Sequence, residues 1–86
     1  MAKVTIRYWA AAKEAAGVQE ESVEAVTLDD LLNRVVASRK PDRRLADVLA
    51  RSSFLVNADP VGRRPRQSIM LDEGAVVEVL PPFAGG

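Results

Sequence analysis

Residues 75–80 read Ala-Val-Val-Glu-Val-Leu, a nearly continuous apolar segment with one acidic side chain. A strand that is apolar on both faces belongs in the middle of a sheet and is covered on at least one side by a helix. We therefore predict that residues 75–80 form a central strand. The Asp-Glu-Gly sequence at residues 72–74 predicts a turn directly before it.

An amphipathic helix that could cover this strand begins after Thr27. The pattern of Thr27 followed by Asp29 and Asp30 resembles a capping box, and both acids suit the positive end of the helix dipole. The helix is expected to extend through two basic residues and to end at Pro41. One buried stripe follows from the i, i+3, i+4, i+7, i+8 spacing of Leu28, Leu31, Leu32, Val35 and Val36.

Other segments carry the signals of shorter strands. Residues 4–9 alternate between apolar and polar side chains, which predicts a strand with one buried face. Residues 21–26 place two valines among acidic residues and predict a short edge strand. Residues 54–56 predict an apolar strand that ends in a turn at residues 58–60, and residues 68–71 predict a brief strand.

Two short helical segments complete the pattern. The alanine-rich residues 10–16 predict a helix that ends at Gly17, and residues 45–49 predict a further helical turn. A chain of 86 residues can bury about 60 to 65% of its unfolded surface, which is enough for one core. We predict a single α+β domain at residues 1–80, with a mixed sheet of about five strands and one main helix packed across it.

The composition excludes several classes of function. The chain has 12 basic and 12 acidic residues, so no net charge would attract nucleic acid or an anionic membrane. It has no cysteine and no histidine, which removes the commonest general base and most transition-metal ligands. We expect this chain to bind no metal or cofactor and to perform no catalysis without a partner.

The N-terminal sequence bears on localisation. Residues 1–3 lead directly into the first predicted strand, without the apolar core of a signal peptide. No apolar run approaches the roughly 20 residues that a membrane-spanning helix needs. We expect a cytoplasmic protein that contacts neither membrane nor nucleic acid.

The last six residues carry the strongest functional signal. Proline cannot donate a ladder hydrogen bond and holds the backbone extended, so we expect residues 81–86 to project from the domain. Glycine has no β-carbon and can enter a narrow channel in a partner. The carboxylate of Gly86 is a poor electrophile at neutral pH and would need activation, for example by adenylylation from ATP. The segment is Pro81, Pro82, Phe83, Ala84, Gly85 and Gly86.

These features resemble one known family along the whole chain. The resemblance is carried by residues 7–18, the pair Val56 and Asn57, the turn at residues 72–74 and the tail at residues 81–86. Together they are similar to the small, sulfur-carrying subunit of molybdopterin synthase, a ubiquitin-like sulfur carrier. The sequence departs from that family at the loop from Gly62 to Gln67, which is longer and more basic.

The resemblance implies a fold and a mechanism. The fold would be a ubiquitin-like β-grasp with its first and last strands adjacent and parallel. A ubiquitin-activating-type enzyme would adenylate Gly86 with ATP, and a sulfurtransferase or desulfurase would supply the sulfur of a thiocarboxylate. The tail would then enter the large subunit of molybdopterin synthase and donate sulfur to cyclic pyranopterin monophosphate. The expected partner contacts are Leu80, Pro81, Pro82, Phe83, Ala84 and Gly85.

Other functions stay open at this point. A terminal Gly-Gly is shared by sulfur carriers for thiamine, cysteine or thiolated nucleotides and by protein modifiers that are joined to lysines. A binding module with incidental glycines is a further possibility. The two prolines followed by an apolar residue, a small residue and Gly-Gly favour the molybdopterin pathway.

Individual side chains outside the terminal glycines have a structural and a functional interpretation. Phe83 is expected to anchor in a pocket of a partner, while for Leu80 packing within the chain and partner contact both stay open. Trp9 could be an interface residue, but it is expected to cover the core of its own domain. The three arginines of the basic loop could meet an acidic partner or a phosphate, but the loop is expected to be simply solvated; they are Arg63, Arg64 and Arg66.

Overall fold

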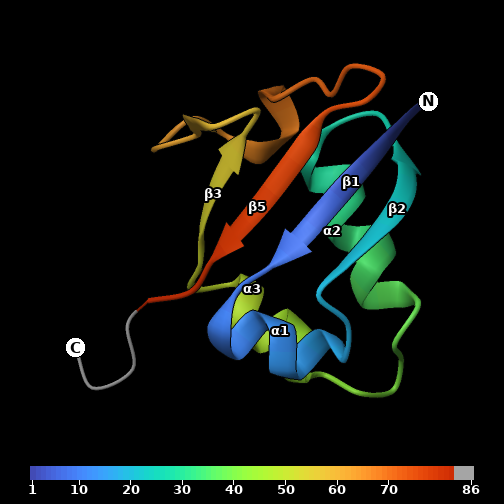
Figure 1. The fold of residues 1–86 in the computed structure, drawn as a ribbon, viewed down its shortest axis with the longest axis vertical. Coiled ribbons are helices and arrows are strands. Elements are labelled where there is room, and N and C mark those ends of the chain that lie inside the picture. Colours follow the sequence, from blue (N-terminus) through green and yellow to red (C-terminus); the bar gives the residue numbers. More distant parts are fainter. Residues whose placement is uncertain (83–86) are drawn as a thin grey trace.

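Strand β5 (Val76–Leu80) lies in the centre of a five-stranded sheet, as its apolar sequence predicts (Figure 1). The structure is a computed structural model and describes residues 1–82. β5 pairs in parallel with β1 (Ala2–Tyr8) and antiparallel with β3 (Ser53–Val56). The parallel contact between the first and last strands is confirmed.

Short strands form both edges of the sheet, whose order is β2-β1-β5-β3-β4. The predicted acidic edge strand is β2 (Glu20–Ala25), which pairs antiparallel with β1. β3 turns into β4 (Asp59–Pro60) through Asn57 and Ala58, whose φ angles of 50° and 71° suit a tight hairpin turn. The turn predicted at residues 58–60 therefore begins earlier, and its last two residues form an edge strand.

Residues 68–71 pair briefly, as predicted, but they form no strand of the sheet. Residues Arg66–Ser68 form a 3-10 helix, and Met70 makes only an isolated bridge to Thr27. The Ile69 carbonyl accepts from the Leu28 amide, and the Leu71 amide donates to the Val26 carbonyl. Because these backbone groups bind the connection between β2 and α2, the segment cannot join a ladder of the sheet.

Helix α2 (Leu28–Ala37) packs across one face of the sheet. The predicted cap is present, since the Thr27 hydroxyl accepts a hydrogen bond of 3.1 Å from the Asp30 amide. The predicted end at Pro41 is wrong, because the helix ends at Ala37 and turns follow it. The Arg39 amide there already bonds the Val36 carbonyl, three residues back, which tightens the last turn.

Two shorter helices lie at the end of the sheet where β1 and β5 end (Figure 1). They are α1 (Ala10–Ala16) and α3 (Arg44–Leu49), both predicted from the sequence. Gly17 ends α1 with a φ of 81°, a left-handed conformation that costs glycine little. This end of the molecule is therefore closed by helices.

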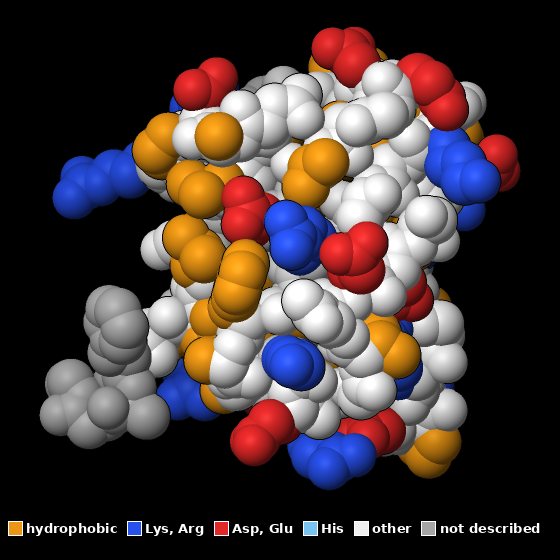
Figure 2. All heavy atoms as spheres, in the orientation of Figure 1, with side chains coloured by type: hydrophobic (Ala, Val, Ile, Leu, Met, Phe, Trp, Pro, Cys, Tyr) orange, Lys and Arg blue, Asp and Glu red, His pale blue; other side chains and the backbone are white. Residues whose placement is uncertain are grey.

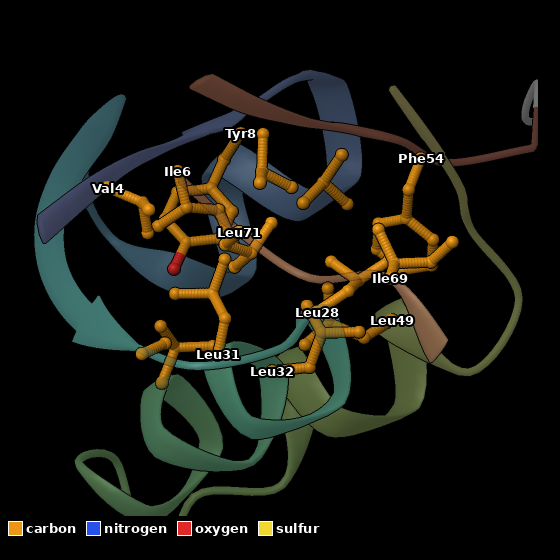
Figure 3. Close-up of a cluster of buried hydrophobic side chains, with 14 of the residues drawn as sticks. Val4, Ile6, Tyr8, Leu28, Leu31, Leu32, Leu49, Phe54, Ile69 and Leu71 are labelled. Carbon is orange, nitrogen blue, oxygen red and sulfur yellow. The ribbon is translucent and has the colours of Figure 1, made fainter. Parts of the chain in front are cut away.

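The core lies between α2 and the inner face of the sheet (Figure 3). Ile6 and Tyr8 of β1 point toward Leu28 and Leu31 of α2, and all four side chains are fully buried. Along β5, the residues at positions 77 and 79 are buried, while those at 76, 78 and 80 are half-buried. The helices thus cover one face of the sheet and leave the other accessible.

Candidate functional site

The structure describes only the base of the predicted tail. Leu80 ends β5, Pro81 is half-buried and Pro82 is exposed. Phe83, Ala84, Gly85 and Gly86 lie outside the described residues, so the roles predicted for them stay predictions. Because β1 and β5 are parallel, the chain leaves the sheet beside the end of β1.

Leu80 belongs to the accessible face of the sheet. Its partner in the register is Ser53 at the start of β3, and its neighbours along β5 alternate between the two faces. Val79 is fully buried, so Leu80 points away from the core. Because Leu80 is only half-buried, part of its side chain is available to a partner.

Trp9 lies on the same accessible face, and the prediction that it covers the core is wrong. The residue is 42% exposed, and its Nε1 donates a 3.1 Å hydrogen bond to Glu78 Oε2. The Arg7 guanidinium lies 5.5 Å from the centre of the ring. Tyr8 is fully buried, and the next side chain along a strand points to the opposite face.

A row of alternating charges crosses this face (Figure 2). Arg7 faces Glu78 across the parallel pair and Glu20 across the antiparallel pair, with 3.4 Å between Arg7 Nε and Glu20 Oε1. Leu55 is the register partner of Glu78 on the other side. The face therefore combines paired charges near β1 with apolar side chains near β3.

The sequence predicted that the basic loop is simply solvated, but two of its arginines contact the rest of the protein. Arg66 is half-buried, with its guanidinium 4.6 Å from the centre of the Phe54 ring. Arg64 and Arg66 both line a hollow that also contains Leu80. Sequence reasoning missed this arrangement because it depends on how the loop folds back onto β3.

A second polar cluster joins β1, β2 and the turn that follows α2. Glu21 Oε2 accepts hydrogen bonds of 2.6 Å from the Tyr8 hydroxyl and from Arg39 Nη2. Burial, together with the hydrogen bond to Glu21, raises the pKa of Tyr8 far above its usual range. The phenol therefore stays protonated and acts as a structural donor.

The described residues offer neither a metal site nor a membrane span. Among residues 1–82, no three or more carboxylates lie close enough together to hold a metal ion. No helix in the same range has the length and apolar character needed to cross a bilayer.

Comparison with solved structures identifies the fold. The small archaeal modifier protein 1 of Methanosarcina acetivorans superposes with a TM-score of 0.83 at 21% identity, covering 100% of this chain and 98% of that one. A protein described as molybdopterin converting factor, subunit 1, from Pyrococcus furiosus gives 0.75 at 26% identity, with 96% and 100% covered. A chain from the Helicobacter pylori complex of molybdopterin-converting factor subunits 1 and 2 gives 0.69 at 21% identity, with 98% and 99% covered. The fold is the predicted ubiquitin-like β-grasp.

Comparison of sequences identifies the family. The molybdopterin synthase sulfur carrier subunit of Chlamydomonas reinhardtii is 30% identical over 87 residues, covering 98% of this chain and 99% of that protein. The model of the ThiS family matches residues 6–86, a range that includes the terminal Gly-Gly. The chain therefore belongs to the ThiS family.

Proposed function

We propose that this chain is a sulfur carrier and serves as the small subunit of a molybdopterin synthase. The observation that carries the proposal is the family match, which extends from the first strand to Gly86. The relative from Chlamydomonas reinhardtii, which this chain matches over nearly its whole length, bears that function in its name. The Gly-Gly terminus and the two prolines before it supply the reactive group and its extended support.

The working group is the terminal carboxylate of Gly86. One of its oxygens attacks the α-phosphorus of ATP on an adenylating enzyme, which releases pyrophosphate and forms an acyl adenylate. A persulfide sulfur of a sulfurtransferase or desulfurase then attacks the acyl carbon and displaces AMP, which leaves an acyl disulfide. A second thiol of the donor enzyme cleaves the S–S bond, so that a thiocarboxylate on Gly86 and a disulfide on the donor remain. The thiocarboxylate sulfur next bonds to a carbon of cyclic pyranopterin monophosphate, and water cleaves the bond between this sulfur and the Gly86 carbonyl carbon, which restores the carboxylate.

Partners perform the catalysis in this scheme. The chain lacks histidine and cysteine, so it has no ordinary base or thiol for these steps. The partners we propose are the large synthase subunit, a ubiquitin-activating-type adenylating enzyme and a sulfur donor. The Helicobacter pylori structure holds subunits 1 and 2 together, which supports a complex with the large subunit. Because residues 1–3 lead into β1 without the apolar core of a signal peptide, we propose that the reaction takes place in the cytoplasm.

The accessible sheet face is the proposed docking surface for these partners. Leu80 and Trp9 are partly exposed on it, beside the point where the tail leaves the sheet. Large apolar and aromatic side chains of this kind anchor many protein interfaces. A partner bound there could guide residues 81–86 into its active site.

Intact mass measurement of the protein from its own cells tests the mechanism. We expect a species in which one oxygen has been replaced by sulfur, localised to the C-terminal peptide. A chain that lacks Gly86 should lose this species and leave molybdoenzymes inactive, whereas a Lys40→Gln control at an exposed position should behave as the wild type. Only free acid after incubation with the activating enzyme, ATP and a sulfur donor would contradict sulfur carriage.

The growth requirements of a strain that lacks the carrier separate the alternative functions. Deletion of the carrier should leave molybdoenzymes inactive without creating a requirement for thiamine or cysteine. A thiamine or cysteine requirement would move the carrier to that pathway. Covalent ladders on a denaturing gel that disappear with Gly86 would instead indicate a protein modifier.

A further inference from the structure

A hollow of about 370 Å³ opens beside the base of the tail, between β3 and the loop that follows β4. In Figure 2, apolar side chains gather on this side of the molecule, over β3 and the end of β5. The hollow combines an apolar floor with two guanidinium groups. Its main lining residues are Phe54, Leu55, Val61, Leu80, Arg64 and Arg66.

Arg66 is fixed in place by neutral groups. Its guanidinium stacks over the Phe54 ring at 4.6 Å, and its Nη2 donates to the Leu49 carbonyl at 3.3 Å. Stacking on an aromatic ring leaves the edges of a guanidinium available for hydrogen bonds. The side chain is therefore held against the wall of the hollow without being neutralised.

Arg64 is fixed in a similar way. Its Nε donates to the Val61 carbonyl at 3.0 Å, and its Nη2 donates to the Pro60 carbonyl at 2.9 Å. Both acceptors belong to the same loop, so the side chain curls back over its own backbone. This arrangement lowers the entropy that a partner would have to remove on binding Arg64.

Neither guanidinium meets a carboxylate in the part of the chain that the structure describes. The ion pairs found there involve Arg7, Arg34, Arg39 and Arg44 only. Arg64 and Arg66 together carry ten N–H donors, and the hydrogen bonds found among residues 1–82 use three of them. The hollow thus presents two positive charges with unused donors.

The position of Leu80 identifies the kind of occupant. Leu80 lines the hollow and is separated from Pro82 by one residue, so a protein that binds the tail comes close to the opening. A carboxylate matches the planar fork of a guanidinium, and its aliphatic stem matches the apolar floor. We propose that Arg64 and Arg66 bind an aspartate or glutamate side chain of the protein that receives the tail. This proposal rests on the proposed function.

The test compares variants of the full-length carrier in binding to its purified large synthase subunit and adenylating enzyme. The pocket variant is Arg64→Gln with Arg66→Gln. The matched control is Arg43→Gln with Arg63→Gln, which removes the same charge from exposed positions outside the hollow. For at least one partner, we expect the pocket variant to raise Kd at low salt by at least about tenfold. The control should stay within about twofold.

The dependence of Kd on salt and two single variants separate recognition of a carboxylate from other causes of weaker binding. The pocket variant should lose most of the dependence of Kd on salt that the wild type shows, since a charge pair has been removed. Arg64→Gln alone should show part of the loss, and because Arg64 is exposed this variant should fold normally. Arg66→Lys keeps the charge but loses the fork, and it should recover only part of the affinity.

The outcomes distinguish this proposal from the proposed function. Equal losses in the pocket and control variants would show general charge steering and overturn the pocket. Unchanged binding in the pocket variant would overturn it as well, while thiocarboxylate formation by the wild type would keep the carrier function intact. A wild-type carrier that binds neither protein would overturn both.

Discussion

At the scale of single residues, Glu21 shows how one carboxylate joins separate elements. It accepts from Tyr8 of β1 and from Arg39 beyond α2, and the Glu21 and Arg39 side chains are only 28% and 17% exposed. Glu21→Gln should lower the free energy of unfolding by about 1 to 3 kcal/mol in a urea titration. Glu24→Gln, at an exposed position of the same strand, should change it by less than about 0.5 kcal/mol. Equal losses in both variants would contradict the role of the cluster.

Asp42 gives a prediction on pH at the same scale. The hydrogen bond from Arg44, with Nη2 at 2.7 Å, lowers the pKa of this carboxyl from 3.8 to about 2. Because the folded pKa lies below the unfolded one, the pair stabilises the fold above about pH 4 and loses this effect as the pH falls toward 2. Carboxyl NMR should show Asp42 titrating late, and Arg44→Gln should move its pKa upward. An unchanged titration curve in that variant would show that Arg44 is not the cause.

At the scale of elements, the N-terminus of α2 depends on one hydroxyl. Thr27→Ala removes the acceptor for the Asp30 amide and should lower the free energy of unfolding by about 1 kcal/mol. Thr27→Ser keeps an oxygen at the same position and should recover most of the loss. Chemical denaturation of the three proteins makes the comparison, and a Thr27→Ser variant as unstable as Thr27→Ala would indicate a loss of packing instead.

The elements that the sequence predicts well are those with local signals. The capped stripe of α2, the alternation of β1 and the apolar run of β5 each indicate a structure without reference to the rest of the chain. The errors fall where tertiary contacts decide. Residues 68–71 have the composition of a strand, yet their backbone groups bond the start of α2 instead. The two-residue strand β4 exists only because a tight turn returns it to β3.

At the scale of the whole molecule, the parallel pairing of β1 and β5 determines where the features of the proposed function lie. It brings Trp9, Leu80 and the hollow to the end of the sheet from which the tail leaves. The sequence predicted the tail, because paired glycines and prolines are visible in any single chain. It could not predict the hollow, since Arg66 and Phe54 are 12 residues apart and meet only after folding.

The predicted division between a stable domain and a working tail leads to the last prediction. Within residues 1–80 lie all the buried apolar side chains that the structure describes, so removal of residues 81–86 should leave the thermal midpoint nearly unchanged. Val79→Ala, a change in the core next to the tail, should lower the free energy of unfolding by about 1 to 3 kcal/mol. The truncated chain should nevertheless form no thiocarboxylate, whereas the Val79→Ala chain should still form it at temperatures where it stays folded. A large fall in the midpoint on truncation would show that the tail belongs to the folded domain.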